Sequence, residues 1–109
     1  MDTNFCIAYC TVPNREVAEQ IAKAIIHEAL AACVNIIPGI TAFYQWKGQL
    51  TEGSELLLMI KTHKKRLPLL EKKIIELHPY EFPEFITTSI IQGNQTYLDW
   101  VAEVVESSE

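Results

Sequence analysis

Apolar and polar positions in the first third of the chain change from strand to helix periodicity. Residues 5–11 form a short apolar run that predicts a buried strand with Cys6, Ala8 and Cys10 on one face. The pair Pro13-Asn14 ends this run, and Asn14 is a suitable N-cap for a helix. Small and apolar residues then recur at helical spacing, which allows close packing on a sheet: Ala18, Ile21, Ala22, Ile25, Ala29 and Ala32.

The middle of the chain predicts a β-hairpin. Residues 33–46 are rich in β-branched and aromatic residues, and Pro38-Gly39 interrupts them in a way that predicts a bulge or bend. Lys47-Gly48 is typical of a hairpin tip, although the loop could extend towards Gly53. The next predicted strand, residues 55–62, contains a nearly continuous apolar run from Leu56 to Ile60. Such a run predicts burial on both faces of a sheet.

The last third predicts a helix, a strand and another helix. Apolar residues at helical spacing (Leu67, Leu70, Ile74 and Leu77) mark a helix that must end before Pro79. Residues 85–91 are rich in Ile and Thr and predict a fourth strand. After Gly93-Asn94, a second apolar series predicts a C-terminal helix: Tyr97, Leu98, Val101 and Val105.

This order predicts an α+β fold of the ferredoxin-like type, βαββαβ, with an added C-terminal helix, in a single domain over residues 1–109. Right-handed crossovers place the first strand beside the third and both crossover helices on one face of the sheet. The other face would be bare, yet the run 56–60 predicts burial there too. A partner subunit is the simplest cover for that face.

Composition supports association and argues against nucleic-acid binding. The chain of 109 residues is 49% hydrophobic and only 21% charged, an apolar surplus that suggests surface hidden in an oligomer. Its net charge of −5 is the wrong sign for neutralising phosphates. The one basic run, 64–66, is expected to be a solvated helix entrance.

The sequence predicts a cytoplasmic protein without a membrane segment. No run approaches the roughly 20 apolar residues of a membrane span, and Met1-Asp2-Thr3-Asn4 does not resemble a secretory signal. The three cysteines, Cys6, Cys10 and Cys33, are odd in number and lack CxxC spacing. They therefore predict neither a disulfide framework nor a zinc ribbon.

The segment 78–84, His-Pro-Tyr-Glu-Phe-Pro-Glu, is the densest group of polar side chains in a predicted loop. Its two prolines make it rigid and extended, and it carries an imidazole, a phenol and two carboxylates. Two interpretations remain open. The segment is either a stiff helix-to-strand turn with His78 as a capping residue, or a functional loop held by the scaffold.

The predicted topology brings His78 to the end of the sheet where the first strand ends, near Cys10. Glu81 and Glu84 lie at the same end. A thiolate and an imidazole suit copper or zinc, and carboxylates could complete the ligand shell. Cys33 lies at the opposite end and is excluded from this site. The alternatives are that Cys10 is a small buried hydrophobe and His78 a helix cap.

Catalysis is not expected. The sequence contains no GxSxG, HExxH, P-loop or GxGxxG motif. A thiol–imidazole pair of Cys10 and His78 lacks any evident oxyanion donors or third orienting group. We therefore expect a protein that is not an enzyme.

Several segments together resemble the CutA divalent-cation tolerance family: 31–39, Ala-Ala-Cys-Val-Asn-Ile-Ile-Pro-Gly; 44–48, Tyr-Gln-Trp-Lys-Gly; 60–62, Ile-Lys-Thr; 78–84; Gly93; and 97–100, Tyr-Leu-Asp-Trp. The resemblance covers nearly the whole chain. It implies a ferredoxin-like subunit in a tight homotrimer, similar in architecture to the PII signalling proteins, with neighbouring subunits completing the sheets. It also implies a role in tolerance of copper and other divalent metal ions.

The family's bacterial copper site is described with a cysteine on the first strand and a His-His pair before Pro-Tyr. Cys10 and His78 match this pattern, whereas Leu77 stands in place of the first histidine. The resemblance therefore implies copper as a bound ion with one expected ligand missing. Glu81 or a neighbouring subunit would have to compensate.

Two functions follow from these observations. In the first, a cytoplasmic homotrimer binds copper through Cys10 and His78. In the second, a PII-like trimer holds a small ligand or partner in intersubunit clefts, where aromatic residues of the hairpin could form a wall or serve as packing anchors. Besides His78, the predicted cleft residues are Tyr44, Trp46, Lys61, Tyr80, Glu81 and Glu84. A third possibility is an oligomeric scaffold with no ligand.

Overall fold

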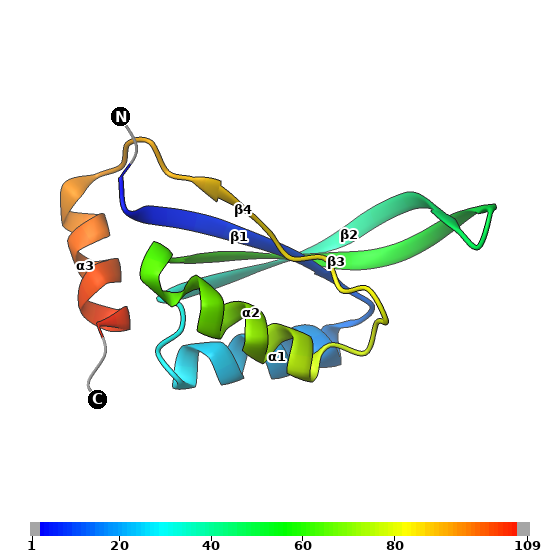
Figure 1. The fold of residues 1–109 in the computed structure, drawn as a ribbon, viewed down its shortest axis with the longest axis horizontal. Helices are drawn as coiled ribbons and strands as arrows, with labels where there is room; N and C mark the ends of the chain where they lie inside the picture. Colours follow the sequence, from blue (N-terminus) through cyan, green and yellow to red (C-terminus); the bar gives the residue numbers. More distant parts are fainter. Residues whose placement is uncertain (1–2, 107–109) are drawn as a thin grey trace.

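The computed structural model describes residues 3–106 and has the predicted βαββαβ order followed by a C-terminal helix (Figure 1). Its elements are β1 (Phe5–Val12), α1 (Arg15–His27), β2 (Cys33–Trp46), β3 (Gln49–His63), the 3₁₀ turn η1 (Lys64–Arg66), α2 (Leu67–Leu77), β4 (Ile86–Ser89) and α3 (Gln95–Val105). The four strands form one antiparallel sheet in the order β2-β3-β1-β4. The first strand therefore lies beside the third, as the crossover rule predicts.

Helices α1 and α2 lie side by side on one face of the sheet, where the main core forms (Figure 1). Strand β1 alternates strictly between half-buried and buried residues, so that Cys6, Ala8, Cys10 and Val12 all face the helices. Their helix partners are the apolar stripes of α1 and α2, which supply Ala18, Ile21, Ile25, Leu70 and Ile74. This packing confirms the predicted helix–sheet contact for Ala18, Ile21 and Ile25. The prediction that the helix continues through Ala29 and Ala32 is wrong, because α1 ends at His27 and Ala29 has a φ of 58°, which no α-helix continues. Ala32 packs against α3 instead.

Among residues 3–106, the opposite face of the sheet is covered only at one end. Helix α3 packs there through Val101 and Val105 against Phe5 and Ala32, near the beginning of β1. Away from α3, burial alternates along residues 56–60 of β3, so that within one subunit this run is buried on one face only. Leu58 and Ile60 are fully buried, whereas Leu57 and Met59 are only half-buried. Because α1 and α2 both occupy the first face, this second face is largely open within one subunit, as predicted. Its cover by a partner subunit stays a prediction.

The hairpin β2–β3 projects well beyond the helices (Figure 1). Its tip is the predicted pair Lys47-Gly48, whose φ angles of 52° and 78° are those of a two-residue turn that follows the strand twist. The predicted irregularity at Pro38-Gly39 is a register shift between Ile37 and Ile40, with Gly39 at φ 79°. Strand β3 begins at Gln49, six positions before the predicted start at 55, because ladder pairing continues to the tip.

Strand β4 is shorter than predicted. It spans Ile86–Ser89 rather than residues 85–91, and all four residues are exposed. The strand pairs with residues Cys6–Tyr9 of β1, and the Ile90 N–H donates one further bond to Phe5 O at 3.0 Å just beyond its end. An edge strand of four exposed residues with few apolar side chains is what soluble sheets use to limit edge pairing.

The basic run 64–66 has a more specific role than the expected solvated helix entrance. The Nε of Arg66 donates a hydrogen bond to the carbonyl oxygen of Val105 at 2.8 Å, at the C-terminal end of α3. A guanidinium at this position satisfies a free carbonyl and opposes the negative end of the helix dipole. Arg66 therefore links η1 to the C-terminal end of α3.

Within residues 3–106, no helix combines the length and the apolar character needed to cross a membrane.

Candidate functional site

His78 lies where the predicted topology places it, at the end of α2 and against the end of β1. Its backbone N–H caps α2 by donating to Ile74 O at 2.9 Å. Its ring Nδ1 accepts a hydrogen bond from the Tyr80 backbone N–H at 3.2 Å, and its Nε2 lies 2.8 Å from Thr11 O. Since Nδ1 is the acceptor, the proton is on Nε2, which donates to the carbonyl. The buried imidazole thus uses both nitrogens within the subunit.

Cys10 is next to Thr11 but faces the core. Its side chain is fully buried, and its Sγ donates to Thr11 O at 3.7 Å. Burial, reinforced by the carboxylates of Glu84 and Glu55, raises the pKa of the Cys10 thiol to about 12. The group is therefore a neutral thiol at physiological pH, whereas a metal ligand is a thiolate.

Leu77, which replaces the histidine implied by the family pattern, packs at the margin of the main core. Within residues 3–106, no three His, Cys, Asp or Glu side chains lie close enough together to hold a metal ion. The topology brings Cys10 and His78 to the same end of the sheet, but the subunit gives them other roles.

The larger hollow is a groove of about 910 Å³ between the projecting hairpin and the loop before β4. We call it the hairpin groove. Its lining residues are Thr11, Ala42, Phe43, Tyr44, Gln45, Trp46, Lys47, Glu55, Tyr80, Glu81, Phe82 and Glu84. Five of the six residues predicted for a ligand cleft are among them: Tyr44, Trp46, Tyr80, Glu81 and Glu84.

Lys61, the sixth predicted cleft residue, does not reach the hairpin groove within the subunit. It pairs across the sheet with Ile7 and Cys33 and donates a hydrogen bond to the Asn35 side chain. These partners lie near the end of the sheet covered by α3, because β3 has already run most of its length from the hairpin. The local motif Ile-Lys-Thr does not indicate how far Lys61 lies from the hairpin.

Two carboxylates on the groove wall are held in place by neutral hydroxyl donors. The Tyr80 hydroxyl donates to Glu55 Oε2 at 2.7 Å, and Thr11 Oγ1 donates to Glu84 Oε1 at 3.4 Å. Burial together with the bond to Glu55 raises the pKa of Tyr80, so the phenol stays protonated and remains a donor. Each carboxylate keeps further acceptor positions for a ligand.

Aromatic side chains link the two sides of the groove. The rings of Trp46 on β2 and Phe82 in the loop meet edge to face with centroids 6.1 Å apart. The Nζ of Lys47 lies 5.7 Å from the Trp46 ring centroid, a cation–π distance. The groove therefore combines an aromatic wall with fixed carboxylates.

Seven groove residues were not predicted from the sequence: Thr11, Ala42, Phe43, Gln45, Lys47, Glu55 and Phe82. Glu55 was expected to begin a strand, and Thr11 to end one; neither pattern indicates a site. Thr11 could have been predicted from its position beside Cys10, since the end of β1 was expected to lie near the loop 78–84.

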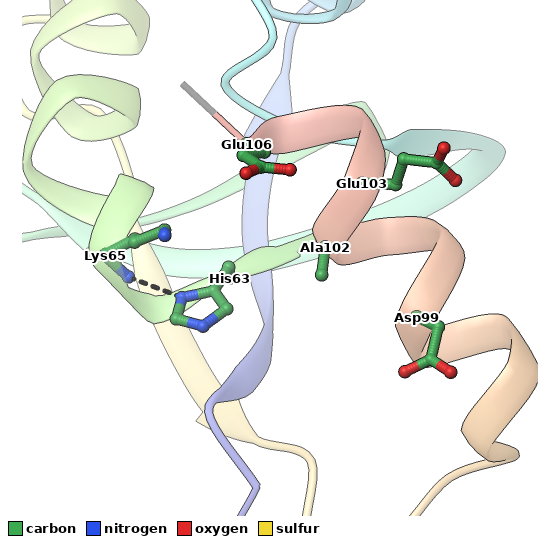
Figure 2. Close-up of a pocket in the computed structure, with 6 residues that line it drawn as sticks. All are labelled: His63, Lys65, Asp99, Ala102, Glu103 and Glu106. Carbon is green, nitrogen blue, oxygen red and sulfur yellow. Dashed lines mark hydrogen bonds between the residues drawn. The ribbon is translucent and has the colours of Figure 1, made fainter. Parts of the chain in front are cut away.

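A second, smaller hollow of about 380 Å³ lies between η1 and α3 (Figure 2). Figure 2 shows His63 and Lys65 on one side and the carboxylates of α3 on the other, with the Lys65 backbone N–H donating to His63 Nδ1 at 3.1 Å. Burial and the neighbouring cations lower the pKa of His63, so the imidazole is neutral at physiological pH. The hollow lies beside the Arg66–Val105 hydrogen bond, and we interpret it as a gap at the contact between η1 and α3.

Comparison with known proteins agrees with this fold over almost the whole chain. The family described as CutA1 divalent ion tolerance protein matches residues 6–104. The divalent-cation tolerance protein CutA of Thermus thermophilus is 48% identical over 97 residues, which cover 89% of this chain and 94% of that protein. Human protein CutA is 49% identical over 100 residues, but these are 92% of this chain and only 56% of the human protein.

Solved structures give the same result. The Thermus thermophilus protein superposes with a TM-score of 0.89 at 47% identity, covering 91% of this chain and 96% of that one. CutA1 from Oryza sativa superposes with a TM-score of 0.93 at 40% identity, covering 98% of each chain. The resemblance inferred from the sequence is thus confirmed, and this chain belongs to the CutA1 divalent ion tolerance family.

Proposed function

We propose that this chain serves divalent-cation tolerance as a PII-like homotrimeric binding module, without catalysis, whose hairpin groove holds a small ligand. The observation that carries the proposal is the groove itself, in which Tyr80 and Thr11 orient two carboxylates beside an aromatic wall. Its volume of about 910 Å³ is in the range of small-molecule sites. Family membership supports the link to divalent cations.

The homotrimer is supported by apolar surface that a single subunit leaves open. Leu50 is 81% exposed on the hairpin and Ile86 is 58% exposed on β4, and Leu57 and Met59 are only half-buried on the open sheet face. Such surface commonly marks an interface. Light scattering should give about three times the 12.4 kDa chain mass; a monomer at micromolar concentration would contradict the trimer.

Copper binding by Cys10 and His78 is the second candidate. One observation favours it. The Cys10 thiol and the His78 ring both donate to Thr11 O, so the two side chains lie on either side of the same carbonyl oxygen. Binding would require Cys10 to lose its proton and His78 to release Thr11. Calorimetric titration of Cu(II) and Cu(I) into the wild type and a Cys10→Ala/His78→Ala variant tests it. Tight binding that the variant loses would establish the site; equal binding would exclude it.

For location we propose the cytoplasm, where thiols stay reduced. Cys6, Cys10 and Cys33 are all free within the described part of the chain. The names of some relatives give other locations. The Arabidopsis thaliana relative is called chloroplastic, and the solved CutA of Archaeoglobus fulgidus is called periplasmic. Fractionation of cells expressing the untagged chain tests the assignment.

Ligand binding in the groove is tested by the melting temperature. A ligand that binds the native state raises the melting temperature in proportion to the logarithm of its concentration. A panel of small metabolites should contain compounds that stabilise the wild type and a Leu69→Ala control, whose site is exposed on α2 and absent from the groove lining. The same compounds should not stabilise Tyr44→Ala. A panel without any shift in the wild type would contradict the proposal.

A further inference from the structure

We propose that the ligand of the hairpin groove is a small organic cation, an ammonium, amidinium or guanidinium group carried on an apolar body. This inference rests on the proposed function, since it names the chemistry of the ligand for the same groove. It is carried by the charge of the lining side chains, by the aromatic wall and by the size of the groove.

The charge on the groove is predominantly negative. Among the described side chains that line it, Glu55, Glu81 and Glu84 are acidic and Lys47 is basic. The two hydroxyl donors, Tyr80 and Thr11, fix carboxylate oxygens without supplying a positive charge. A cationic ligand with N–H donors would supply the missing counter-charge and use the remaining acceptor positions.

The aromatic wall, formed by Trp46 and Phe82, already has a cation beside it, the ammonium group of Lys47. The Lys47 ammonium stands 5.7 Å from the Trp46 centroid, and the face of an indole is the strongest cation–π partner among the side chains. Phe82 supports the indole edge to face from the opposite side of the groove. An aromatic face beside carboxylates is the arrangement that binds ammonium-type ligands.

The geometry favours an organic cation over a bare metal ion. Glu55 belongs to β3, whereas Glu81 and Glu84 belong to the loop before β4, and Glu55 and Glu84 are held by different partners. A divalent ion needs several oxygens converging at roughly 2.0–2.6 Å. A groove of about 910 Å³ instead leaves room for an apolar body against the aromatic wall.

Three probes of nearly equal shape separate charge from shape: benzamidinium, benzamide and benzoate. We expect benzamidinium to bind the wild-type protein at least about tenfold more tightly than benzamide, and benzoate to bind least, when measured by calorimetry at low salt. Raising the salt concentration should weaken benzamidinium binding but not benzamide binding.

Isosteric variants locate the site. Glu55→Gln and Glu84→Gln each remove a charge but keep an acceptor, and each should weaken benzamidinium binding about tenfold while leaving benzamide unchanged. Glu71→Gln, on the exposed surface of α2, is the matched control and should bind as the wild type does. Circular dichroism and light scattering of every variant confirm that fold and assembly are retained.

The outcomes distinguish this inference from the proposed function. If benzamide or benzoate binds as tightly as benzamidinium, or if Glu71→Gln weakens binding as much as Glu55→Gln, the organic-cation inference is overturned. If no probe binds but a metabolite from the panel stabilises the protein through Tyr44, the inference fails and the groove proposal stands. If neither probes nor metabolites bind, both fail.

Discussion

The Nε2–H of His78 donates to the carbonyl oxygen of Thr11 across 67 positions of sequence, at 2.8 Å. This bond ties the end of α2 to the end of β1, and the same ring orders the Tyr80 backbone through Nδ1. Tyr80 in turn holds Glu55, while Thr11 holds Glu84. The hydrogen bonds of His78 therefore position Thr11 and Tyr80, the two residues that hold the carboxylates of the hairpin groove.

His78→Ala should lower the free energy of unfolding by about 2 kcal/mol, because two hydrogen bonds are lost and the carbonyl of the half-buried Thr11 keeps only the weak Cys10 thiol as a donor. Urea unfolding at a fixed protomer concentration measures this change. His27→Ala, at an exposed position at the end of α1, is the control and should change stability by less than about 0.5 kcal/mol. Equal effects of the two substitutions would show that His78 does not fasten the loop.

Cys10 should make the protein sensitive to alkaline pH. Its pKa is about 12 in the fold and 9.0 as the ordinary value, so the folded state holds the proton more tightly. This contribution to stability is complete below pH 9 and is lost as the pH rises from 9 towards 12; by about pH 10.5 the loss reaches about 2 kcal/mol. Unfolding measured between pH 8 and 10.5 should therefore decline less steeply for Cys10→Ala, and Cys33→Ala should keep the wild-type slope. Parallel slopes for all three proteins would contradict this account.

Arg66→Ala should loosen α3 without unfolding the sheet, because the Val105 carbonyl loses a charged donor at the end of the helix. Hydrogen exchange should show amide protection in α3 reduced by about 1–2 kcal/mol, while β1 stays protected. Lys65→Ala, an exposed change in the same turn, is the control. Unchanged protection of α3 in Arg66→Ala would mean that its apolar contacts alone fasten it.

Gly39→Ala tests the bulge in β2. Gly39 has a φ of 79°, and a Cβ there would meet no atom within 4 Å, so the whole penalty is backbone strain. We expect a loss of about 1–2 kcal/mol in the free energy of unfolding. Gly53→Ala is the matched control, since its added Cβ would make an ordinary contact with the Tyr44 ring at 3.6 Å. A neutral Gly39→Ala would mean that the bulge relaxes to a regular ladder.

The sequence predicted what depends on local chemistry and on connectivity. Pro38-Gly39 and Lys47-Gly48 marked the bulge and the hairpin tip because few residues adopt those backbone angles. The crossover rule placed His78 at the end of β1 before any contact was known. Five residues predicted for an intersubunit cleft from the family resemblance line the groove of one subunit.

The remaining features depend on three-dimensional contacts that no local pattern encodes. The protonation of Cys10 depends on burial beneath the helices and on Glu55 and Glu84, which approach from other elements. Lys61 was predicted for an intersubunit cleft; within one subunit, β3 carries it to the end of the sheet opposite the hairpin, and its place in a cleft between subunits stays a prediction. The occupation of both His78 nitrogens became visible only with the positions of Thr11 and Tyr80.

The hairpin groove is proposed to bind small organic cations between its carboxylates and its aromatic wall. The most direct measurement is a titration of benzamidinium into the isotope-labelled protein, followed by backbone amide chemical shifts. We expect shifts that grow with concentration at residues 42–47 and 80–84, and that need about tenfold higher benzamidinium concentrations in Glu55→Gln. Shifts confined to α3 and η1, or no shifts at millimolar benzamidinium, would contradict the proposal.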